Sequence, residues 1–384
     1  MRTVIMIIGA SLLLIALGIY AFVRWMKKSD ARYIQKILQR EHATSSFVMK
    51  ENGDVQVDLR SSEMMPLAST VKIVIAIEYA FQVYEGKIDN HEPIHLRDLE
   101  TYYLPKLDGG AHEAWLHYAK EKKLVQKEMV TLREVARGMI AFSSNANTEF
   151  LMQRLGIEQI EERMKSIGIE AHSPLFYLGS ATFIPYELHR QQESDRTMKE
   201  AKKKMLETMK QMSDEEWRLL SSVIHEKLTA DPHYKQRANV LDWWDYDYDQ
   251  LYSKKFTKST AATYADIMEQ INNRQFPQKA QEELEYVLGM LMERPENQKW
   301  LKRAGQKGGS TFFIVTDALF AEDQRGNTFE MAIFFNDLKW YQTHKIMSSL
   351  NEFELKCLSD PSFRKHVYEA LNPGRDSKSE RMER

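Results

Sequence analysis

The chain contains a single cysteine, Cys357, among its 384 residues. One thiol cannot form an internal disulfide, and it cannot supply the several thiolates of a cysteine-based zinc site. The chain also lacks an excess of charge of either sign, because 53 Lys and Arg residues stand against 55 Asp and Glu residues, for a formal net charge of −2. That balance gives no electrostatic footprint for nucleic acid. With 43% hydrophobic residues, the chain can bury the core of one large domain or two intimate ones.

Charged residues are missing from Val4 to Val23, an apolar run long enough at helical rise to cross a bilayer. A convincing signal-peptide cleavage site is missing too, since Ile19-Tyr20-Ala21 has a large residue in the wrong place. We therefore predict an uncleaved transmembrane helix, a membrane anchor over residues 1–30. Charge counting would keep the residues after this helix in the cytoplasm, because four basic residues follow it: Arg24, Lys27, Lys28 and Arg32.

The spacing of hydrophobic residues divides the remainder of the chain into predicted helices and strands. Residues 31–44 have a helical, mixed-charge pattern, typical of a stalk or of a first helix. Strand patterns at 46–50 and 55–60 flank Asn52-Gly53, a strong hairpin signal. Helix and loop patterns cover 66–302, strands return at 311–321 and 328–336, a last amphipathic helix covers 340–358, and a polar tail over 373–384 is expected to be disordered.

Strands near both ends of one chain predict a single antiparallel sheet. We expect an α/β fold in which this sheet, from 45–65 and 311–358, is flanked by helices and carries an inserted all-helical part at 66–302. Together these segments form one domain over 45–372, with a charged insertion at about 187–245. The site is expected in the cleft between sheet and helices.

A serine and a lysine stand three residues apart where a helix is expected to begin. Ser69 follows Pro66 in the chain, and the run after Lys72 is apolar enough for a buried helix. Residues at this spacing share a helix face, and a desolvated lysine of lowered pKa is one known base for a serine nucleophile. A second match to the same pattern, Ser362 to Lys365, lies in a charged stretch without an apolar helix behind it.

Two further motifs follow in order. Ser143-Ser144-Asn145 stands at a helix junction, and Lys307-Gly308-Gly309-Ser310-Thr311 precedes a strand pattern. Together the three motifs resemble those of the penicillin-binding protein and class A β-lactamase superfamily, and the resemblance covers roughly Ser46 to Leu358. Ser143 or Asn145 taken alone is more typical of a helix cap.

The resemblance implies a role for each residue. Ser69 would be the acylated nucleophile, Lys72 its base or proton relay, and Ser143 the donor of a proton to the leaving nitrogen. Asn145 would hold Lys72 and the substrate amide, and Lys307 would attract the substrate carboxylate. Gly308, Gly309, Ser310 and Thr311 would line the substrate, and the N–H groups of Ser69 and Ser310 would form the oxyanion hole.

The chain departs from the family pattern in two places. Gly308 stands where the family has Thr or Ser, so a hydroxyl that contacts the substrate carboxylate is missing, and Ser310 or Thr311 must compensate. The Glu-x-x-Leu-Asn motif that activates the deacylating water in class A β-lactamases is missing as well. An acidic and aromatic stretch at 241–249 offers four other candidate bases: Asp242, Asp245, Asp247 and Asp249. A calcium loop is not expected there, because its sixth and twelfth positions are Gln250 and Phe256.

Residues 91–95 satisfy the His-Glu-x-x-His expression of zinc metalloproteases. That motif requires a continuous helix, which Pro93 would interrupt, so His91 and His95 are interpreted as loop residues.

The resemblance therefore implies a membrane-anchored serine hydrolase that needs no metal or organic cofactor and acts on a β-lactam or a D-alanyl-D-alanine-type amide. Two alternatives stay open: a D-alanyl-D-alanine carboxypeptidase acting on peptidoglycan stem peptides, and a penicillin-binding sensor or scaffold that acylates without turnover. Because substrates of this family lie outside the cytoplasm, we expect residues after 30 to be extracytoplasmic, against the charge count.

Overall fold

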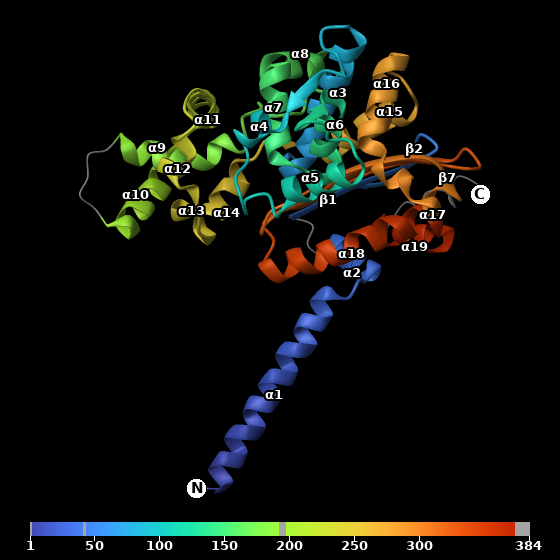
Figure 1. The fold of residues 1–384 in the computed structure, drawn as a ribbon. Helices are drawn as coiled ribbons and strands as arrows, with labels where there is room; N and C mark the ends of the chain where they lie inside the picture. The colour runs from blue at the N-terminus through green and yellow to red at the C-terminus, as the bar shows by residue number, and fades with distance from the viewer. Residues whose placement is uncertain (1, 41–43, 192–196, 373–384) are drawn as a thin grey trace, which may run out of the picture.

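The computed structural model describes residues 2–40, 44–191 and 197–372 (Figure 1). The predicted disorder of residues 373–384 lies outside these ranges. The strands are β1 (Ser45–Glu51), β2 (Asp54–Leu59), β3 (Met65–Pro66), β4 (Pro93–His95), β5 (Met129–Thr131), β6 (Lys258–Ser259), β7 (Leu301–Ser310), β8 (Val315–Asp323) and β9 (Thr328–Phe335).

The helices, with short 3-10 or π turns labelled η, are α1 (Arg2–Lys27), α2 (Ala31–Arg40), η2 (Ala68–Val71), α3 (Lys72–Tyr84), α4 (Leu96–Glu100), α5 (Ala111–Glu121), α6 (Leu132–Arg137), η3 (Gly138–Phe142), α7 (Asn145–Leu155), α8 (Ile157–Ser166), η4 (Ser180–Phe183), α9 (Ile184–Arg190), α10 (Met198–Gln211), α11 (Asp214–Ala230), α12 (Tyr234–Ala238), α13 (Val240–Trp243), α14 (Tyr246–Lys255), α15 (Ala261–Asn272), α16 (Gln278–Leu288), η5 (Gly289–Glu293), α17 (Pro295–Gln298), α18 (Trp340–Ser359) and α19 (Pro361–Leu371).

The two ends of the folded part meet in one antiparallel sheet, as predicted, and its strand order is β2-β1-β9-β8-β7. Asn52 and Gly53 turn the β1–β2 hairpin with φ of 54° and 83°, the positive values that such a tight turn requires. The predicted α/β architecture is therefore confirmed. Strand β7 begins at Leu301, earlier than the predicted strand at 311, so Lys307 lies inside a strand and not ahead of one.

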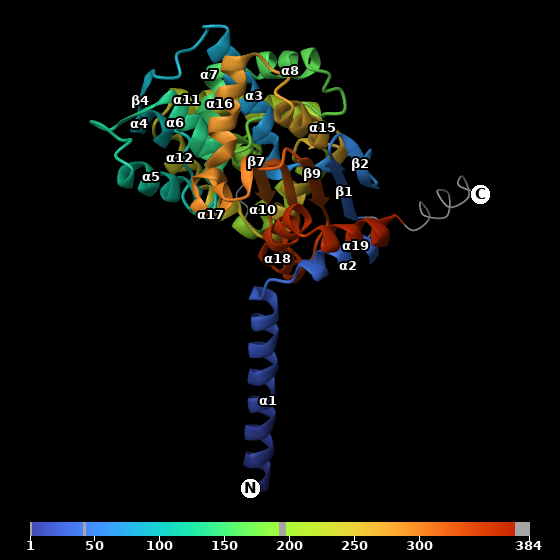
Figure 2. The same ribbon diagram turned by 90° about the vertical axis from the view of Figure 1, so that its right-hand side faces the viewer.

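Both faces of the sheet are covered (Figures 1 and 2). Along β9, Ala332 and Phe334 pack into the core shared with α3 and α15, while Met331, Ile333 and Phe335 pack against α2, α18 and α19. This alternation follows from the period of two residues in a strand. Because Ile34 and Leu38 of α2 are fully buried there, residues 31–40 form the first helix of the folded part and not a stalk.

Helix α1 covers the apolar run that was predicted to span a membrane, and it projects from the folded body (Figure 1). Within the described ranges, no helix combines the length and the apolar character needed to cross a bilayer. The predicted transmembrane helix was therefore wrong. Aromatic residues at the end of α1 pack within the chain instead: the Phe22 ring lies 6.0 Å from the Trp340 ring of α18, and the Trp25 ring lies 5.7 Å from the Tyr33 ring of α2.

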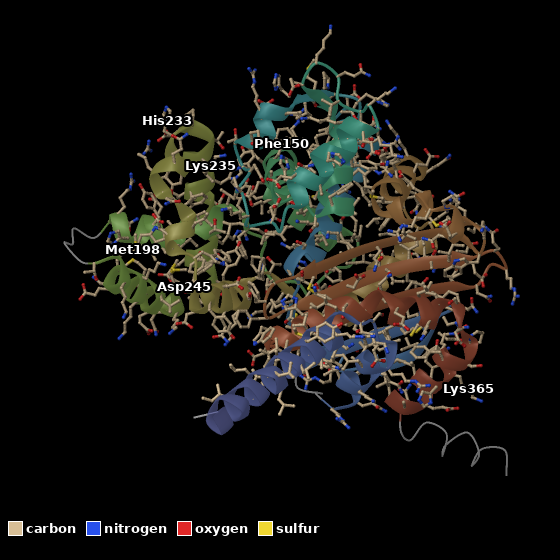
Figure 3. All side chains as sticks on the ribbon, turned by 60° about the horizontal axis from the view of Figure 1, so that its bottom comes forward. Phe150, Met198, His233, Lys235, Asp245 and Lys365 are labelled. Carbon is tan, nitrogen blue, oxygen red and sulfur yellow. The ribbon has the colours of Figure 1, made fainter. Side chains whose placement is uncertain are left out.

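The charged insertion forms helices α9 to α13, which stand to one side of the sheet (Figure 1). Figure 3 shows Met198 and Asp245 in this region, far from Lys365 in the last helix. Thr197 with Glu200, and Ser213 with Glu216, form capping boxes that begin α10 and α11. The His-Glu-x-x-His segment is not the continuous helix that such a site requires. His91 lies in a turn, as predicted, but His95 ends strand β4 (Pro93–His95) and is not a loop residue.

Candidate active site

Ser69 lies on the 3-10 turn η2, immediately before α3. Hydrogen bonds of the preceding residue, Leu67, hold this turn in place. The Leu67 N–H donates to the Thr257 carbonyl at 2.9 Å, and Thr316 Oγ1 of β8 donates to the Leu67 carbonyl at 2.7 Å. Ser69 is half-buried, whereas the residues on either side of it are buried. The serine is thus a reachable hydroxyl on rigid backbone, although α3 itself begins at Lys72 and not at Ser69 as predicted.

Lys72 is fully buried at the start of α3 and points to the second motif. Its Nζ donates to the Ser143 carbonyl at 2.7 Å, to Ser143 Oγ at 3.2 Å and to Asn145 Oδ1 at 2.8 Å. Burial lowers the pKa of Lys72 well below its ordinary value, and the charge of Lys307 lowers it further. A buried amine of lowered pKa is suited to accept a proton.

Ser143 lies directly after the π-helical turn η3, with a φ of 69°. This left-handed conformation is costly for a residue other than glycine, and such strain gathers at functional sites. The N-cap of α7 is the next residue, Ser144, whose Oγ accepts from the Asn147 N–H at 3.2 Å. Because Ser144 takes the capping role, the hydroxyl of Ser143 and the amide of Asn145 are left to face the lysines.

Lys307 approaches Ser143 from the sheet. Its Nζ donates to Ser143 Oγ at 3.0 Å, so this hydroxyl lies between two buried lysine amino groups, those of Lys72 and Lys307. Burial lowers the pKa of Lys307 to about 8, against the opposing charge of Asp317. The positive charge of Lys307 in turn disfavours the protonated form of Lys72.

Strand β7 passes against the backbone of the nucleophile. A Cβ atom added to Gly309 would lie 2.4 Å from the Ser69 N atom and 2.9 Å from the Leu67 carbonyl oxygen. A glycine is therefore required at 309 by the close approach of the two backbones, although its own conformation is ordinary extended strand.

A cavity of about 890 Å³ opens above these residues. Its lining includes Ser69, Ser143, Asn145, Gly308, Gly309, Ser310 and Thr311. Ser310 is exposed at the end of β7, whereas Thr311 Oγ1 is occupied in the following turn, where it accepts from the Phe313 N–H at 3.0 Å and from Ser253 Oγ at 2.9 Å. Of the two hydroxyls expected to compensate for Gly308, Ser310 is the one left accessible.

Of the four candidate aspartates, Asp249 lies in the cavity wall. It is 5% exposed, and among the described residues its Oδ2 has no hydrogen-bond partner. Burial raises its pKa to about 6, partly offset by a hydrogen bond from the Phe312 backbone. Asp242 and Asp247 are exposed, and Asp245 caps helix α14, so Asp249 is the one aspartate of the stretch that the fold brings to the site.

Two cavity residues, Asp317 and Glu354, were missed by the sequence analysis. Asp317 pairs with Gly308 across the β7–β8 hairpin, and Glu354 belongs to α18. No motif marks either residue, because the strand register alone determines which side chain faces Gly308. The second Ser-x-x-Lys match is not part of the cavity lining; it lies in the first turns of α19, where Asp360 caps the helix at Ser362 and Phe363 and where Figure 3 labels Lys365.

One family model and several solved structures are similar to this chain. A family model described as "Beta-lactamase enzyme family" matches residues 30–351. A class A beta-lactamase from Bacteroides cellulosilyticus DSM 14838 is 14% identical over 90% of this chain and 99% of that one, with a TM-score of 0.49. A beta-lactamase from Chitinophaga pinensis DSM 2588 is 14% identical over 85% and 98%, with a TM-score of 0.48. A mutant of PBP-A in its acyl-enzyme complex with penicillin G is 14% identical over 84% and 97%, with a TM-score of 0.45. A search of curated proteins gave no match.

Proposed function

Because the chain belongs to the beta-lactamase enzyme family, whose model matches residues 30–351, we propose that it is a serine hydrolase that forms an acyl-enzyme on Ser69. Its substrate is a β-lactam or a D-alanyl-D-alanine-type amide. The observation that carries the proposal is the position of Ser143 Oγ, 3.2 Å from Lys72 Nζ and 3.0 Å from Lys307 Nζ, in a cavity that also exposes Ser69.

In the proposed reaction, Ser69 Oγ attacks the substrate carbonyl carbon while neutral Lys72 accepts its proton. The carbonyl oxygen becomes negative between the N–H groups of Ser69 and Ser310, which stabilise it. The carbon–nitrogen bond then breaks as Ser143 gives a proton to the leaving nitrogen, and the lysine amino groups hydrogen-bonded to Ser143 Oγ replace that proton. The product of this half-reaction is an ester between Ser69 and the acyl group.

Water must hydrolyse that ester for turnover, and Asp249 is our candidate base for this step. Its carboxyl lines the cavity, and its pKa of about 6 leaves it largely ionised at neutral pH. Since the glutamate motif of class A β-lactamases is absent, we propose slow turnover of β-lactams. The same absence favours a second candidate function, a sensor that acylates without hydrolysis.

Labelling with a fluorescent penicillin tests the acylation directly. The label is expected on the wild-type chain and not on Ser69→Ala, while Ser362→Ala, which alters the second Ser-x-x-Lys match, is expected to label normally. Label that persists in Ser69→Ala would refute the proposal. Substrates of this kind also favour an extracytoplasmic location for the catalytic domain, and digestion by protease added to intact cells would test that location.

A further inference from the structure

Two acidic side chains form one end of the cavity, beside the catalytic motif on β7. Asp317 of β8 and Glu354 of α18 are 7% and 4% exposed, and both line the cavity. Gln306 joins them, because its Nε2 donates to Asp317 Oδ2 and to Glu354 Oε2, each at 3.1 Å. We call Gln306, Gly308, Asp317 and Glu354 the acidic end.

Each carboxyl group has one oxygen left over. Throughout the ranges that the structure describes, Asp317 Oδ1 and Glu354 Oε1 have no hydrogen-bond partner. A buried oxygen without a partner is costly, and the donor nearest to both groups, the Gln306 amide, is already used on their other oxygens. The acidic end therefore has fewer hydrogen-bond donors than acceptors. A proton held by either carboxyl, or the N–H groups of a ligand, would supply the missing donors.

Gly308 and Asp317 are parts of the same arrangement. They are direct partners across the β7–β8 hairpin, and a Cβ atom on Gly308 would lie 2.8 Å from Asp317 Oδ2. A threonine or serine at 308 would take the space beside this carboxylate. Where the family has a hydroxyl at 308, this chain therefore has the carboxyl group of Asp317. A carboxylate accepts hydrogen bonds from a substrate, whereas a hydroxyl can also donate one.

The acidic end also changes the electrostatics around Lys307. Burial lowers the pKa of Lys307, and the negative charge of Asp317 partly offsets that effect. Burial and the charge of Asp317 both raise the pKa of Glu354. A substrate carboxylate placed here would meet one ammonium group and two acids. Burial also raises the pKa of Asp317 to about 7, so both acids are at least partly protonated at neutral pH. A positive group would favour their ionised forms, whereas a further carboxylate would disfavour them.

The position of the acidic end identifies the part of the substrate that it meets. Lys307 and Gly308 point to opposite faces of β7, but the charge of Asp317 acts on Lys307, whose Nζ contacts Ser143 Oγ, the proposed proton donor to the leaving nitrogen. We propose that the acidic end binds a nitrogen group with N–H donors, an ammonium or a carboxamide, on the leaving-group side of the substrate, in place of the carboxylate. This substrate class rests on the proposed acylation of Ser69.

Three matched amides test the preference. N-acetyl-D-alanine is joined to glycine, to glycinamide or to ethylenediamine, which end in a carboxylate, a carboxamide and an ammonium. Their dissociation constants are measured by calorimetry on the Ser69→Ala variant, where no reaction occurs. At least one nitrogen amide is expected to bind about fivefold or more tightly than the carboxylate, a difference typical of one hydrogen bond. The tighter of the two identifies the group.

Variants in the same Ser69→Ala background locate the preference. Asp317→Asn and Glu354→Gln are each expected to reduce the ratio of the carboxylate dissociation constant to that of the preferred nitrogen amide by half or more. Glu330→Gln is the matched control, because Glu330 is also a buried acid with an unpartnered oxygen, yet it lies on β9 outside the cavity lining. If Asp317→Asn does not fold, Glu354→Gln carries the comparison.

Equal or tighter binding of the carboxylate, or a preference that survives both substitutions, would overturn the inference. Release of the amine by the wild-type chain is measured separately by chromatography. If the binding preference is present and no amine is released, the acylation proposal fails while the ligand preference stands.

Discussion

Replacing Gly309 with alanine tests the packing of β7 against the nucleophile. The added Cβ would lie 2.4 Å from the Ser69 N atom, 2.9 Å from the Leu67 carbonyl oxygen and 2.9 Å from Thr316 Oγ1. Two of these neighbours are backbone atoms and the third holds Leu67 through a hydrogen bond, so none can move without shifting the turn that carries Ser69. Overpacking of this kind costs about 1–3 kcal/mol in the free energy of unfolding.

The larger effect is expected on acylation, because the Ser69 N–H is half of the proposed oxyanion hole. A displacement on the order of 1 Å at such a donor lowers the rate by about 10²-fold. Stopped-flow measurement of acylation by nitrocefin, with urea unfolding of the same samples, separates the two effects.

Gly289→Ala is the matched control, since the nearest atom to its Cβ would be the Ala304 carbonyl oxygen at an ordinary 3.5 Å. Acylation of that variant is expected to be unchanged, with a stability change of less than about 1 kcal/mol. Gly309→Ala acylating at the wild-type rate would refute our description of this contact.

Three further predictions concern the proton-transfer groups. Asp249→Asn is expected to lengthen the acyl-enzyme lifetime by about 10²-fold without slowing acylation, whereas Asp245→Asn is not, and mass spectra taken over time measure both. The acylation rate is expected to rise with pH as Lys72 loses its proton. It is expected to fall above about pH 8 as Lys307, whose pKa is about 8, loses its charge. A flat profile between about pH 6 and about pH 10 would contradict these roles. Because Ser143 has a φ of 69°, Ser143→Gly is expected to be more stable in urea than Ser143→Ala by roughly 1 kcal/mol, with acylation lost equally in both.

The sequence was informative where chemistry depends on residue type and order. Three motifs selected Ser69, Lys72, Ser143, Asn145 and Lys307. In the fold both lysines donate to Ser143 Oγ, Lys72 also donates to Asn145, and Ser69 lines the same cavity. The Asn-Gly hairpin and the sheet built from both chain ends were likewise predictable, because turn residues and alternating patterns are local signals.

Features that depend on tertiary pairing were not predictable. Strand β7 contains Gly305, Gly308 and Gly309, which have low strand propensity, and its conformation is stabilised by pairing with β8. Asp317 and Glu354 reach the cavity through strand register and helix packing, for which the sequence carries no motif. The apolar run at the N-terminus was misinterpreted as a membrane span because composition alone does not show that its last aromatic residues pack on α2 and α18.

Mass spectrometry of the purified chain after exposure to penicillin G tests the central claim most directly. Our account predicts a gain equal to the mass of the intact antibiotic, located by proteolysis on the peptide that contains Ser69, and persisting long enough to isolate. The Ser69→Ala variant should show no gain. An unmodified wild-type chain, or an adduct on any other residue, would contradict the assignment of Ser69 as the nucleophile.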